Sequence, residues 1–378
     1  MIGRPPIPLG LLVGLGILAV AATAGGVYIE DDPHASDPDR RTETRLPATP
    51  HVPELAAYLA EIDAGEPLIY RDLAVCPVMR QGGSGPGGRW LTMDAAIQGG
   101  DLVVAEVPGG GSVPTLLMHN RSRDAHVLIL AGEVVSGGKQ TRTVRQDTIL
   151  APGQKVTANV FCVEAHRWKG GDGFKAGGVV VPQSIQKELR KGADQGRVWS
   201  EVARNNAALG TENRTGSLET GLKAPKVRAD LEAVRKTIVP EMPKGCVGFV
   251  FVDRRHGHAV GAELFGRADL AAALLPKLLD AYAVDLVLQR DAKADRRGTD
   301  DREAARAMLG LMRRTGSHRA ETPGSGAGIQ MRSSGLVGDG LGLGADLVHF
   351  GCQVEQRIVP AAQPTRDAPA QQSSRIIR

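Results

Sequence analysis

The chain contains 378 residues, of which 46 are Lys or Arg and 42 are Asp or Glu, so its formal net charge is +4. This nearly balanced charge and an aromatic content of only 3% exclude the usual nucleic-acid-binding protein, which is strongly basic and carries aromatic stacking platforms. A hydrophobic content of 42% excludes a globally disordered chain, and the length predicts two structural units.

The first segment, residues 1–29, predicts export. Arg4 precedes an apolar run over residues 8–29, which is long enough to span a bilayer. Because the positive end of such a segment stays in the cytoplasm, we expect the rest of the chain in the periplasm or another extracytoplasmic space. The Ala-Thr-Ala sequence at residues 22–24 is typical of a signal peptidase site. A cleaved signal peptide, a retained membrane anchor and a buried core helix are the three alternatives.

Residues 30–51 are mostly polar residues and proline, and they predict a disordered linker. A β-rich domain is expected over residues 52–168. Its apolar runs are short and separated by turns rich in Gly, Pro and Asp, a pattern typical of a β-sandwich or barrel. The predicted strands are residues 68–70, 73–78, 102–107, 114–118, 127–130, 148–150 and 156–163.

A smaller α+β domain is expected over residues 169–290, so the predicted fold class is α+β with a sandwich or barrel-like first half. Helices are predicted for residues 183–191, 195–209 and 224–239 because apolar residues recur there at helical spacing. Two strands over residues 246–252 and 259–264 precede a further helix. Pro276 is expected to kink that helix or to mark its true start.

The last part of the chain is predicted to be less regular. Residues 291–340 combine dense charge with Ser and Gly, and they predict a flexible insertion. A returning strand is expected over residues 341–359, followed by a disordered tail over residues 360–378.

The four cysteines lie far apart in the sequence and include no pair with the spacing of a zinc site. They are Cys76, Cys162, Cys246 and Cys352. In an oxidising compartment they could form one or two disulfides, and four buried free thiols are the alternative.

One polar turn is a candidate anion-binding site. Residues 132–142 leave a predicted strand, turn at a pair of glycines and enter another strand. The glycines let the backbone approach a ligand closely, while Lys139, Gln140 and Arg142 supply hydrogen-bond donors. A plain β-turn with solvated charges is the alternative.

A second polar cluster lies at the end of a predicted strand and contains Cys162, Glu164, His166, Arg167 and Trp168. Strand alternation places Cys162, Glu164 and His166 on one face, so Glu164 is a candidate catalytic acid or base. Arg167 and Trp168 are candidate ligand-binding residues. The alternative is a structural ion pair between Glu164 and either Arg167 or Arg142.

Gln195 and Trp199 begin a third polar stretch, which contains several asparagines and extends to Ser217. Amides that flank a tryptophan suit the recognition of a sugar or nucleotide by stacking and hydrogen bonding. Helix capping and hydrogen bonds within loops are the alternative use of the same residues.

Four motifs in this order resemble a known family. They are Leu130-Ala131-Gly132-Glu133, Gly137-Gly138-Lys139-Gln140-x-Arg142, Cys162-Val163-Glu164-x-His166-Arg167-Trp168 and Gln195-x-x-x-Trp199. They are similar to the bacterial and archaeal "ARG and rhodanese-phosphatase-superfamily-associated protein" family, first kind, over roughly residues 55–290 and a strand near Cys352. The activity of that family is uncharacterised. The association with ADP-ribosylglycohydrolase and rhodanese-phosphatase-like proteins implies nucleotide or phosphate-ester chemistry.

Together, these features favour an envelope-located binding module for a polar, anionic or nucleotide-like small molecule. One alternative is a hydrolase of a nucleotide-, ADP-ribose- or sugar-phosphate-like substrate, with Glu164 as acid or base and Lys139, Arg142 and Arg167 as anion contacts. The other is a structural envelope protein without a ligand site. We find no motif for a metal or cofactor, and we expect membrane contact only through an uncleaved residue 1–29 segment. In either ligand-dependent interpretation, Arg142 and Glu164 are predicted to lie close together.

Overall fold

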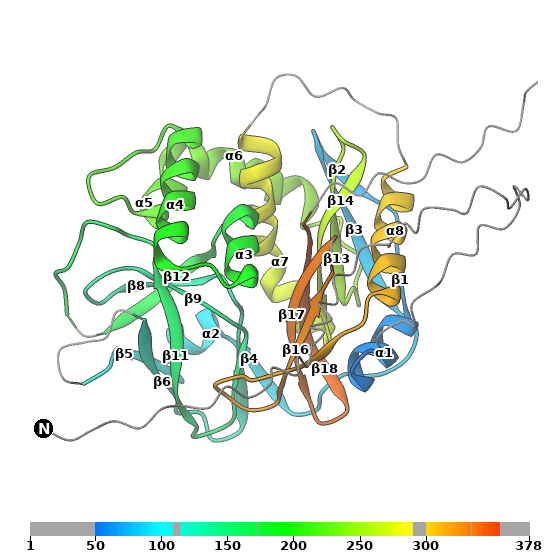
Figure 1. Cartoon of the computed structure of the whole chain (residues 1–378), viewed down its shortest axis with the longest axis horizontal. Helices are drawn as coiled ribbons and strands as arrows, with labels where there is room; N and C mark the ends of the chain where they lie inside the picture. Colours follow the sequence, from blue (N-terminus) through cyan, green and yellow to red (C-terminus); the bar gives the residue numbers. More distant parts are fainter. Residues whose placement is uncertain (1–49, 109–113, 172, 290–299, 334, 356–378) are drawn as a thin grey trace, which may run out of the picture. The chain divides into compact units, whose positions relative to one another are not determined.

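The computed structural model of the protein describes residues 50–108, 114–171, 173–289, 300–333 and 335–355 (Figure 1). The predicted export segment, the predicted linker up to residue 49 and the predicted tail lie outside the described residues. Within the described ranges, no helix is both long and apolar enough to cross a membrane. The described part combines helices with extensive antiparallel sheets, which confirms the predicted α+β class.

The largest sheet in the described part of the chain has nine strands, and neighbouring strands are antiparallel. Their order is β1-β3-β13-β14-β18-β17-β16-β15, and β2 also pairs with β3. The strands are β1 (Ile62–Ala64), β2 (Leu68–Tyr70), β3 (Leu73–Arg80), β13 (Gly248–Asp253), β14 (His258–Phe265), β15 (His318–Ala320), β16 (Ala327–Arg332), β17 (Leu336–Leu343) and β18 (Asp346–Val354).

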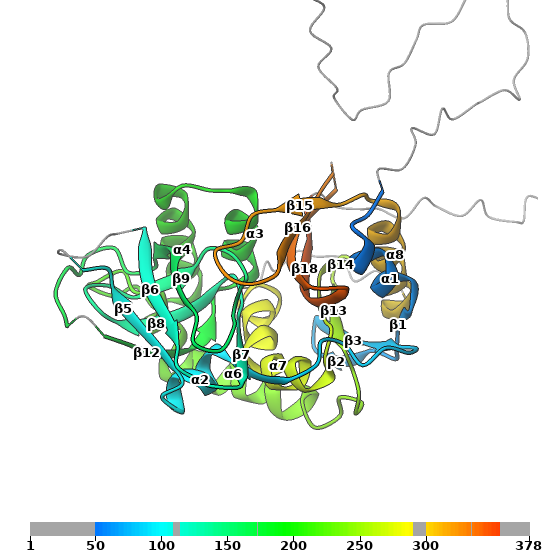
Figure 2. The same cartoon turned by 90° about the horizontal axis from the view of Figure 1, so that it is seen from below.

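Helices cover both faces of this nine-stranded sheet (Figure 2). Helices α1 (Pro53–Ala60) and α8 (Asp301–Arg314) share an apolar cluster with Cys76 and Val250, whereas α7 (Ala268–Ala283) shares another with Val75 and Phe251. Successive side chains of a strand point to opposite faces. The central strands must therefore be apolar along their whole length, which explains the continuous apolar runs in β3 and β13.

The remaining strands form two smaller sheets that curl into a half-barrel (Figure 1). A six-stranded sheet has the order β12-β8-β9-β11-β6-β5, and a three-stranded sheet has the order β10-β7-β4 with β4 parallel to β7. Their shared apolar core includes Leu116, Met118, Val135 and Val160, and α2 (Met93–Gln98) packs beside them. The strands are β4 (Arg89–Thr92), β5 (Leu102–Glu106), β6 (Thr115–Asn120), β7 (Ala125–Ile129), β8 (Glu133–Gly137), β9 (Arg142–Val144), β10 (Thr148–Leu150), β11 (Lys155–Cys162) and β12 (Phe174–Val180).

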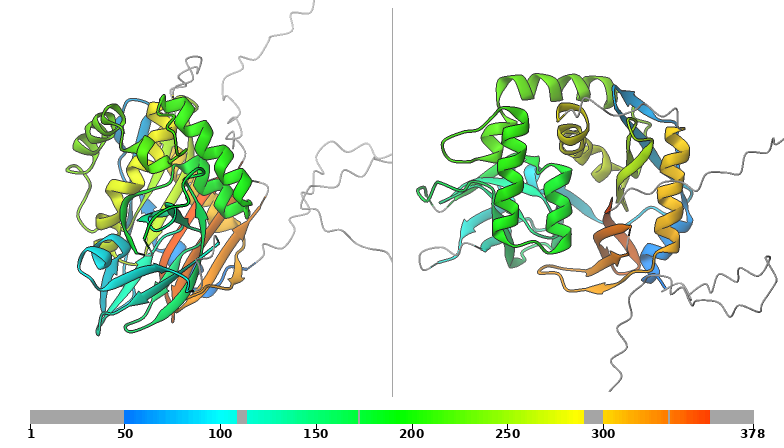
Figure 3. Two further views of the ribbon diagram at one scale, coloured as in Figure 1. Left: turned by 90° about the vertical axis from the view of Figure 1, so that its left-hand side faces the viewer. Right: turned by 45° about the horizontal axis from the view of Figure 1, so that its top comes forward.

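Helices α3 (Gln183–Lys191), α4 (Gln195–Leu209), α5 (Leu218–Leu222) and α6 (Pro225–Ile238) follow the half-barrel strands in the sequence (Figure 3). The predicted helices at α3, α4 and α6 are confirmed. Helix α7 begins at Ala268 and continues through Pro276, so the prediction that this proline marks the helix start is wrong. A short π-helical turn, η1 (Val284–Leu288), extends α7.

The structure corrects the predicted flexible insertion over residues 300–333 and 335–340, whereas residues 291–299 of that prediction lie outside the described residues. Residues 301–333 contain α8, β15 and β16, and β17 begins at Leu336. Within this highly charged stretch, α8 is an amphipathic helix, because its apolar residues are buried on one side. They are Ala305, Met308, Leu309 and Met312. The glycines of β17 allow close packing, since a Cβ atom at Gly340 would lie 2.2 Å from a backbone oxygen of β18.

All four cysteines are buried and free, so the alternative of small buried thiols describes them. The predicted division into residues 52–168 and 169–290 stays a prediction. The nine-stranded sheet nevertheless combines β1, β2 and β3 from the first range with strands from later parts of the chain.

Candidate functional site

The predicted anion-binding turn joins β8 to β9 beside the end of β11. Gly137 and Gly138 have φ values of 117° and 51°, which side-chain-bearing residues rarely adopt. A Cβ atom on Gly138 would also lie 2.1 Å from the ring of Phe174. Packing and backbone geometry therefore account for both glycines without a ligand.

Glu164 and Arg167 form an ion pair that fixes this turn. Arg167 donates from Nε to a carboxylate oxygen of Glu164 at 2.9 Å, and its other nitrogens donate to the carbonyl oxygens of Gly137, Gly138 and Lys169. The same carboxylate oxygen accepts hydrogen bonds from the backbone N–H and the hydroxyl of Thr141, at 3.1 and 3.0 Å. This is the structural alternative that the sequence left open.

The protonation of Glu164 follows from these contacts. Burial acts to raise the pKa of its carboxyl group, but the hydrogen bonds from Arg167 and Thr141 outweigh burial and hold the pKa below its usual value. Glu164 is therefore ionised at neutral pH, whereas a general acid requires a raised pKa. His166, its expected partner in proton transfer, is exposed.

Two glutamine side chains also form hydrogen bonds within the protein. Gln140 donates to the carbonyl oxygen of Glu164 at 2.9 Å, and its own oxygen accepts from the thiol of Cys162 at 2.9 Å. Gln195 of α4 accepts from the backbone N–H of Cys162 at 2.8 Å and donates to the carbonyl oxygen of Cys162 at 2.9 Å. These amides attach the turn and α4 to the end of β11.

Arg142 is the exception among the predicted binding residues. Its side chain is fully buried, and Nη1 donates to the Gln140 oxygen at 3.2 Å. Among the described residues, Nε and Nη2 have no hydrogen-bond partner, and no carboxylate forms an ion pair with the guanidinium group. Arginine is almost never fully buried unless it is paired.

The two unpartnered nitrogens form one edge of the guanidinium group, and elsewhere in this protein that edge binds carboxylates. Arg306 donates from Nε and Nη2 to the two oxygens of Asp63, at 3.1 and 2.7 Å. Arg267 binds Asp269 in the same way, at 2.9 and 2.7 Å. The free edge of Arg142 therefore has the geometry that binds two oxygens of a carboxylate or phosphate.

Trp168 covers the Arg142 site. The Arg142 guanidinium carbon lies 5.7 Å from the centre of the Trp168 ring, and Lys139 Nζ lies 5.5 Å from it. Trp168 is nevertheless 49% exposed, and Trp199 of α4 is 37% exposed. Both indole rings are therefore accessible to a molecule that arrives from solvent.

The predicted proximity of Arg142 and Glu164 is indirect. Gln140 hydrogen-bonds to the backbone of Glu164 and to the guanidinium group of Arg142, but the two charged groups form no ion pair.

The asparagines of the third polar stretch form hydrogen bonds within the helix and the loop, as the alternative interpretation predicted. Asn205 donates to the Glu201 carbonyl, and Asn206 and Asn213 donate to the Ser217 carbonyl.

A buried charge network was missed by the sequence analysis. His349 Nδ1 lies 2.6 Å from a carboxylate oxygen of Asp147, and its Nε2 lies 3.1 Å from Glu263, which also contacts Arg190 at 3.4 Å. Burial acts to lower the pKa of His349, but the two carboxylates outweigh it and raise the pKa to about 9. His349 and Asp147 are 202 positions apart, and no local motif marks them.

The site thus consists of a buried, unpaired arginine beneath an exposed tryptophan, held by an antiparallel α+β scaffold. The fold class is thus α+β, and the unpaired edge of Arg142 is the candidate site within it. The chain belongs to the family of the ARG and Rhodanese-Phosphatase-superfamily-associated Protein domain, which matches residues 61–352 and confirms the resemblance of the four motifs. No curated protein and no solved structure matches the chain.

Proposed function

We propose that the protein is a binding module for a small ligand with a carboxylate or phosphate group, and that Nε and Nη2 of Arg142 hold this group. The observation that supports the proposal is the empty edge of a fully buried guanidinium group. An unpaired buried charge is costly because it loses its hydration without gaining an opposite charge. An anionic ligand offsets this cost, and no described carboxylate of the protein does so.

The surroundings of Arg142 suit a ligand that arrives from solvent. Gln140 holds Nη1, so the guanidinium group keeps one orientation, while its other edge has no hydrogen-bond partner among the described residues. Trp168 is half exposed and lies over the guanidinium group, so we expect this side chain to move when a ligand binds. Its indole ring also offers a stacking surface for a planar group, which favours a nucleotide-like ligand.

A ligand-stabilisation screen tests this function. Phosphate, sulfate, simple carboxylates, AMP and ADP-ribose are added at constant ionic strength, and the melting temperature is measured. A ligand at 100 times its Kd stabilises the folded state by about 2.7 kcal/mol. We expect stabilisation by at least one of these compounds and its loss in Arg142→Met.

The matched control is Arg204→Met, which removes an arginine whose side chain is 70% exposed on α4. This variant should keep the full response to the ligand. Tryptophan emission should change on binding, and Trp168→Phe should abolish that change. A response that persists in Arg142→Met, or no response to any compound, would contradict the proposal and favour a structural protein without a ligand site.

We further infer that the folded part acts outside the cytoplasm. Arg4 and the apolar run of residues 8–29 support this location, because the positive end of such a segment remains inside. A reporter that is active only in the periplasm, fused after Arg45, should be active. A cytoplasmic reporter at the same position should be silent, and the reverse result would exclude export.

A further inference from the structure

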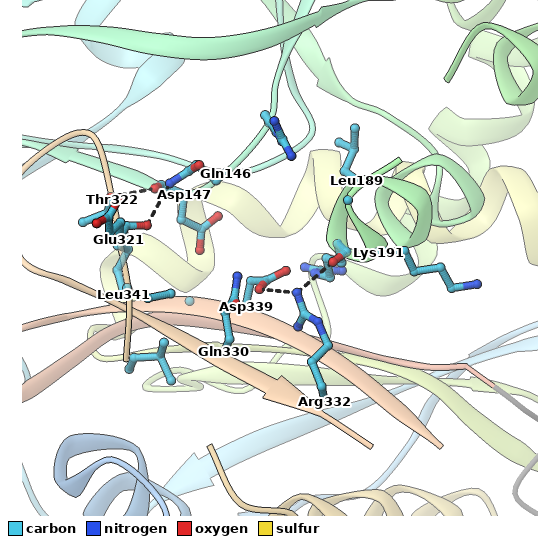
Figure 4. A pocket seen from close by; sticks show the side chains of 17 residues that line it. Gln146, Asp147, Leu189, Lys191, Glu321, Thr322, Gln330, Arg332, Asp339 and Leu341 are labelled. Carbon is cyan, nitrogen blue, oxygen red and sulfur yellow. Dashed lines mark hydrogen bonds and ion pairs between the residues drawn. The ribbon is translucent and has the colours of Figure 1, made fainter. Parts of the chain in front are cut away.

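A second polar cleft lies away from the predicted binding turn, between the end of α3 and strands β16 and β17 (Figure 4). The cleft has a volume of about 310 Å³, which is within the range of small-molecule sites. Four basic side chains line it: Arg145, Arg190, Lys191 and Arg332. None of them belongs to the Arg142 site.

Two of these basic residues are held in place by the protein itself. Arg332 pairs with Asp339 at 2.8 Å (Figure 4), and it also donates to the carbonyl oxygen of Arg190 at 2.7 Å. Arg190 contacts Glu263, and its side chain is 4% exposed. Its Nε remains buried without a hydrogen-bond partner among the described residues. This wall of the cleft is therefore fixed and carries one unused donor, and the cleft is lined by Asp147, Glu321 and Asp339 as well as by the basic residues.

Arg145 adds a donor group that can reach solvent. It is exposed, and its guanidinium group lies 5.6 Å from the centre of the Phe161 ring. No described residue accepts a hydrogen bond from the Arg145 side chain. Together, Arg145 and Arg190 provide free N–H donors of the kind that bind phosphate or carboxylate oxygens.

The sheet side of the cleft carries acceptors. Gln330 of β16 and Asp339 of β17 are directly paired across the two strands, and both line the cleft. Arg332 occupies one Asp339 oxygen, and within the described ranges the Gln330 amide makes no hydrogen bond. A carboxylate and an amide placed opposite cationic donors suit hydroxyl groups, which donate to the acceptors without adding charge.

We propose that this cleft is a second ligand site, and that it takes a small anion with several hydroxyl groups, such as a sugar phosphate. Arg145 and Arg190 hold the phosphate, and Asp339 and Gln330 accept hydrogen bonds from the sugar hydroxyls. The proposal is independent of the function assigned to Arg142, since it uses no residue of that site.

Isothermal titration of the full chain with ribose 5-phosphate tests the proposal, with orthophosphate and ribose as the two partial ligands. The titration is performed on the natural chain and on Arg142→Met, so that binding at the other site is recognised. We expect ribose 5-phosphate to bind more tightly than either partial ligand in both backgrounds. Arg145→Ala should weaken binding by about 10- to 100-fold, as expected for a lost charge-assisted hydrogen bond.

Gln330→Ala should reduce the affinity for ribose 5-phosphate but not that for orthophosphate. Arg123→Ala, which removes an exposed arginine outside the cleft, is the matched control and should bind normally. Absence of binding, unchanged binding in Arg145→Ala, or binding that disappears in Arg142→Met would overturn the proposal. Equal affinity for orthophosphate and ribose 5-phosphate would overturn the assignment of the hydroxyl contacts.

Discussion

Arg142 and Arg190 are both removed from water, but they differ in their partners. Arg190 belongs to a network in which Glu263 lies between it and His349. Arg142 donates to a neutral amide and lies beneath an indole ring, and within the described ranges it forms no ion pair with a carboxylate. The carboxylate that pairs with Arg190 comes from a distant strand, since Glu263 lies in β14. The missing carboxylate at Arg142 is the difference on which the proposed anion site rests.

The largest expected effect on stability is at Arg190, which has a carboxylate partner. Glu263→Gln preserves shape but leaves Arg190 and His349 without their shared carboxylate, so it should lower the free energy of unfolding by about 3–5 kcal/mol. Urea denaturation measures this change. Glu232→Gln, which removes an exposed carboxylate of α6, is the control. Its urea midpoint should equal that of the natural protein. Equal midpoints for both variants would show that the network contributes no stability.

The same network should make the stability of the protein depend on pH. The pKa of His349 is raised to about 9 in the folded state, above its usual value near 6.5, so its stabilisation is fully present below pH 6.5. That stabilisation should be lost as the pH rises through about 9. The loss is on the order of 3 kcal/mol by linkage.

Other buried groups also titrate, since burial raises the pKa of Asp280 to about 7 and that of Asp285 to about 6. The contribution of His349 is therefore taken as the difference between the natural chain and His349→Asn, measured by urea denaturation from pH 6 to pH 10. Parallel stability curves for the two proteins would exclude a raised histidine pKa.

A smaller loss is expected at the junction of α4 and β11. Gln195→Ala removes both hydrogen bonds to the backbone of Cys162 and leaves those groups partly buried, so it should destabilise the protein by about 1–3 kcal/mol. The ligand response of Arg142 should remain. If Gln195→Ala instead removes ligand binding without changing the melting temperature, this residue contacts the ligand directly.

The smallest effect on stability is expected at Arg142, which has no described ionic partner. Arg142→Met removes a buried charge that has no ionic partner, so the unfolding free energy without ligand should change by less than about 1 kcal/mol or increase. Urea denaturation in a buffer without phosphate or carboxylate measures it, beside Arg204→Met. A loss of 3 kcal/mol or more would mean that Arg142 has a structural role, and the comparison with Arg190 would fail.

Local patterns predicted much of the fold. Helices α3, α4 and α6 followed from apolar spacing, and seven strands of the first half followed from short apolar runs between turns. Strand β12 was missed because Lys175, Gly177 and Gly178 interrupt its apolar pattern, and a Cβ atom at Gly177 would lie 2.5 Å from a backbone oxygen. Helix α8 was recognisable from Ala305, Met308, Leu309 and Met312, but its charged residues favoured a loop in the prediction.

The predicted site was assembled from neighbouring motifs, and most of its residues do lie together. Their roles could not be read from sequence, because hydrogen-bond partners decide them. Gln140 and Arg167 form hydrogen bonds within the protein, whereas Nε and Nη2 of Arg142 have no hydrogen-bond partner among the described residues. The His349 network was beyond sequence reasoning because its members come from four distant parts of the chain. Pairing of β14 with β18 brings Glu263 close to His349, whereas Asp147 precedes β10 and Arg190 lies in α3.

The position of β18 has a consequence for how the protein is made. This strand is the last described element of the chain, yet it lies between β14 and β17 inside the nine-stranded sheet. During synthesis, β14 therefore emerges long before the strand that hydrogen-bonds to it. Until then, one edge of Gly261–Phe265, which is apolar except for Glu263, remains unpaired, and such edges promote aggregation. A chain that stops before Asp346 should accumulate in inclusion bodies even though it contains Arg142, Glu164 and Trp168. The edge of β14 is therefore protected only once β18 has been synthesised.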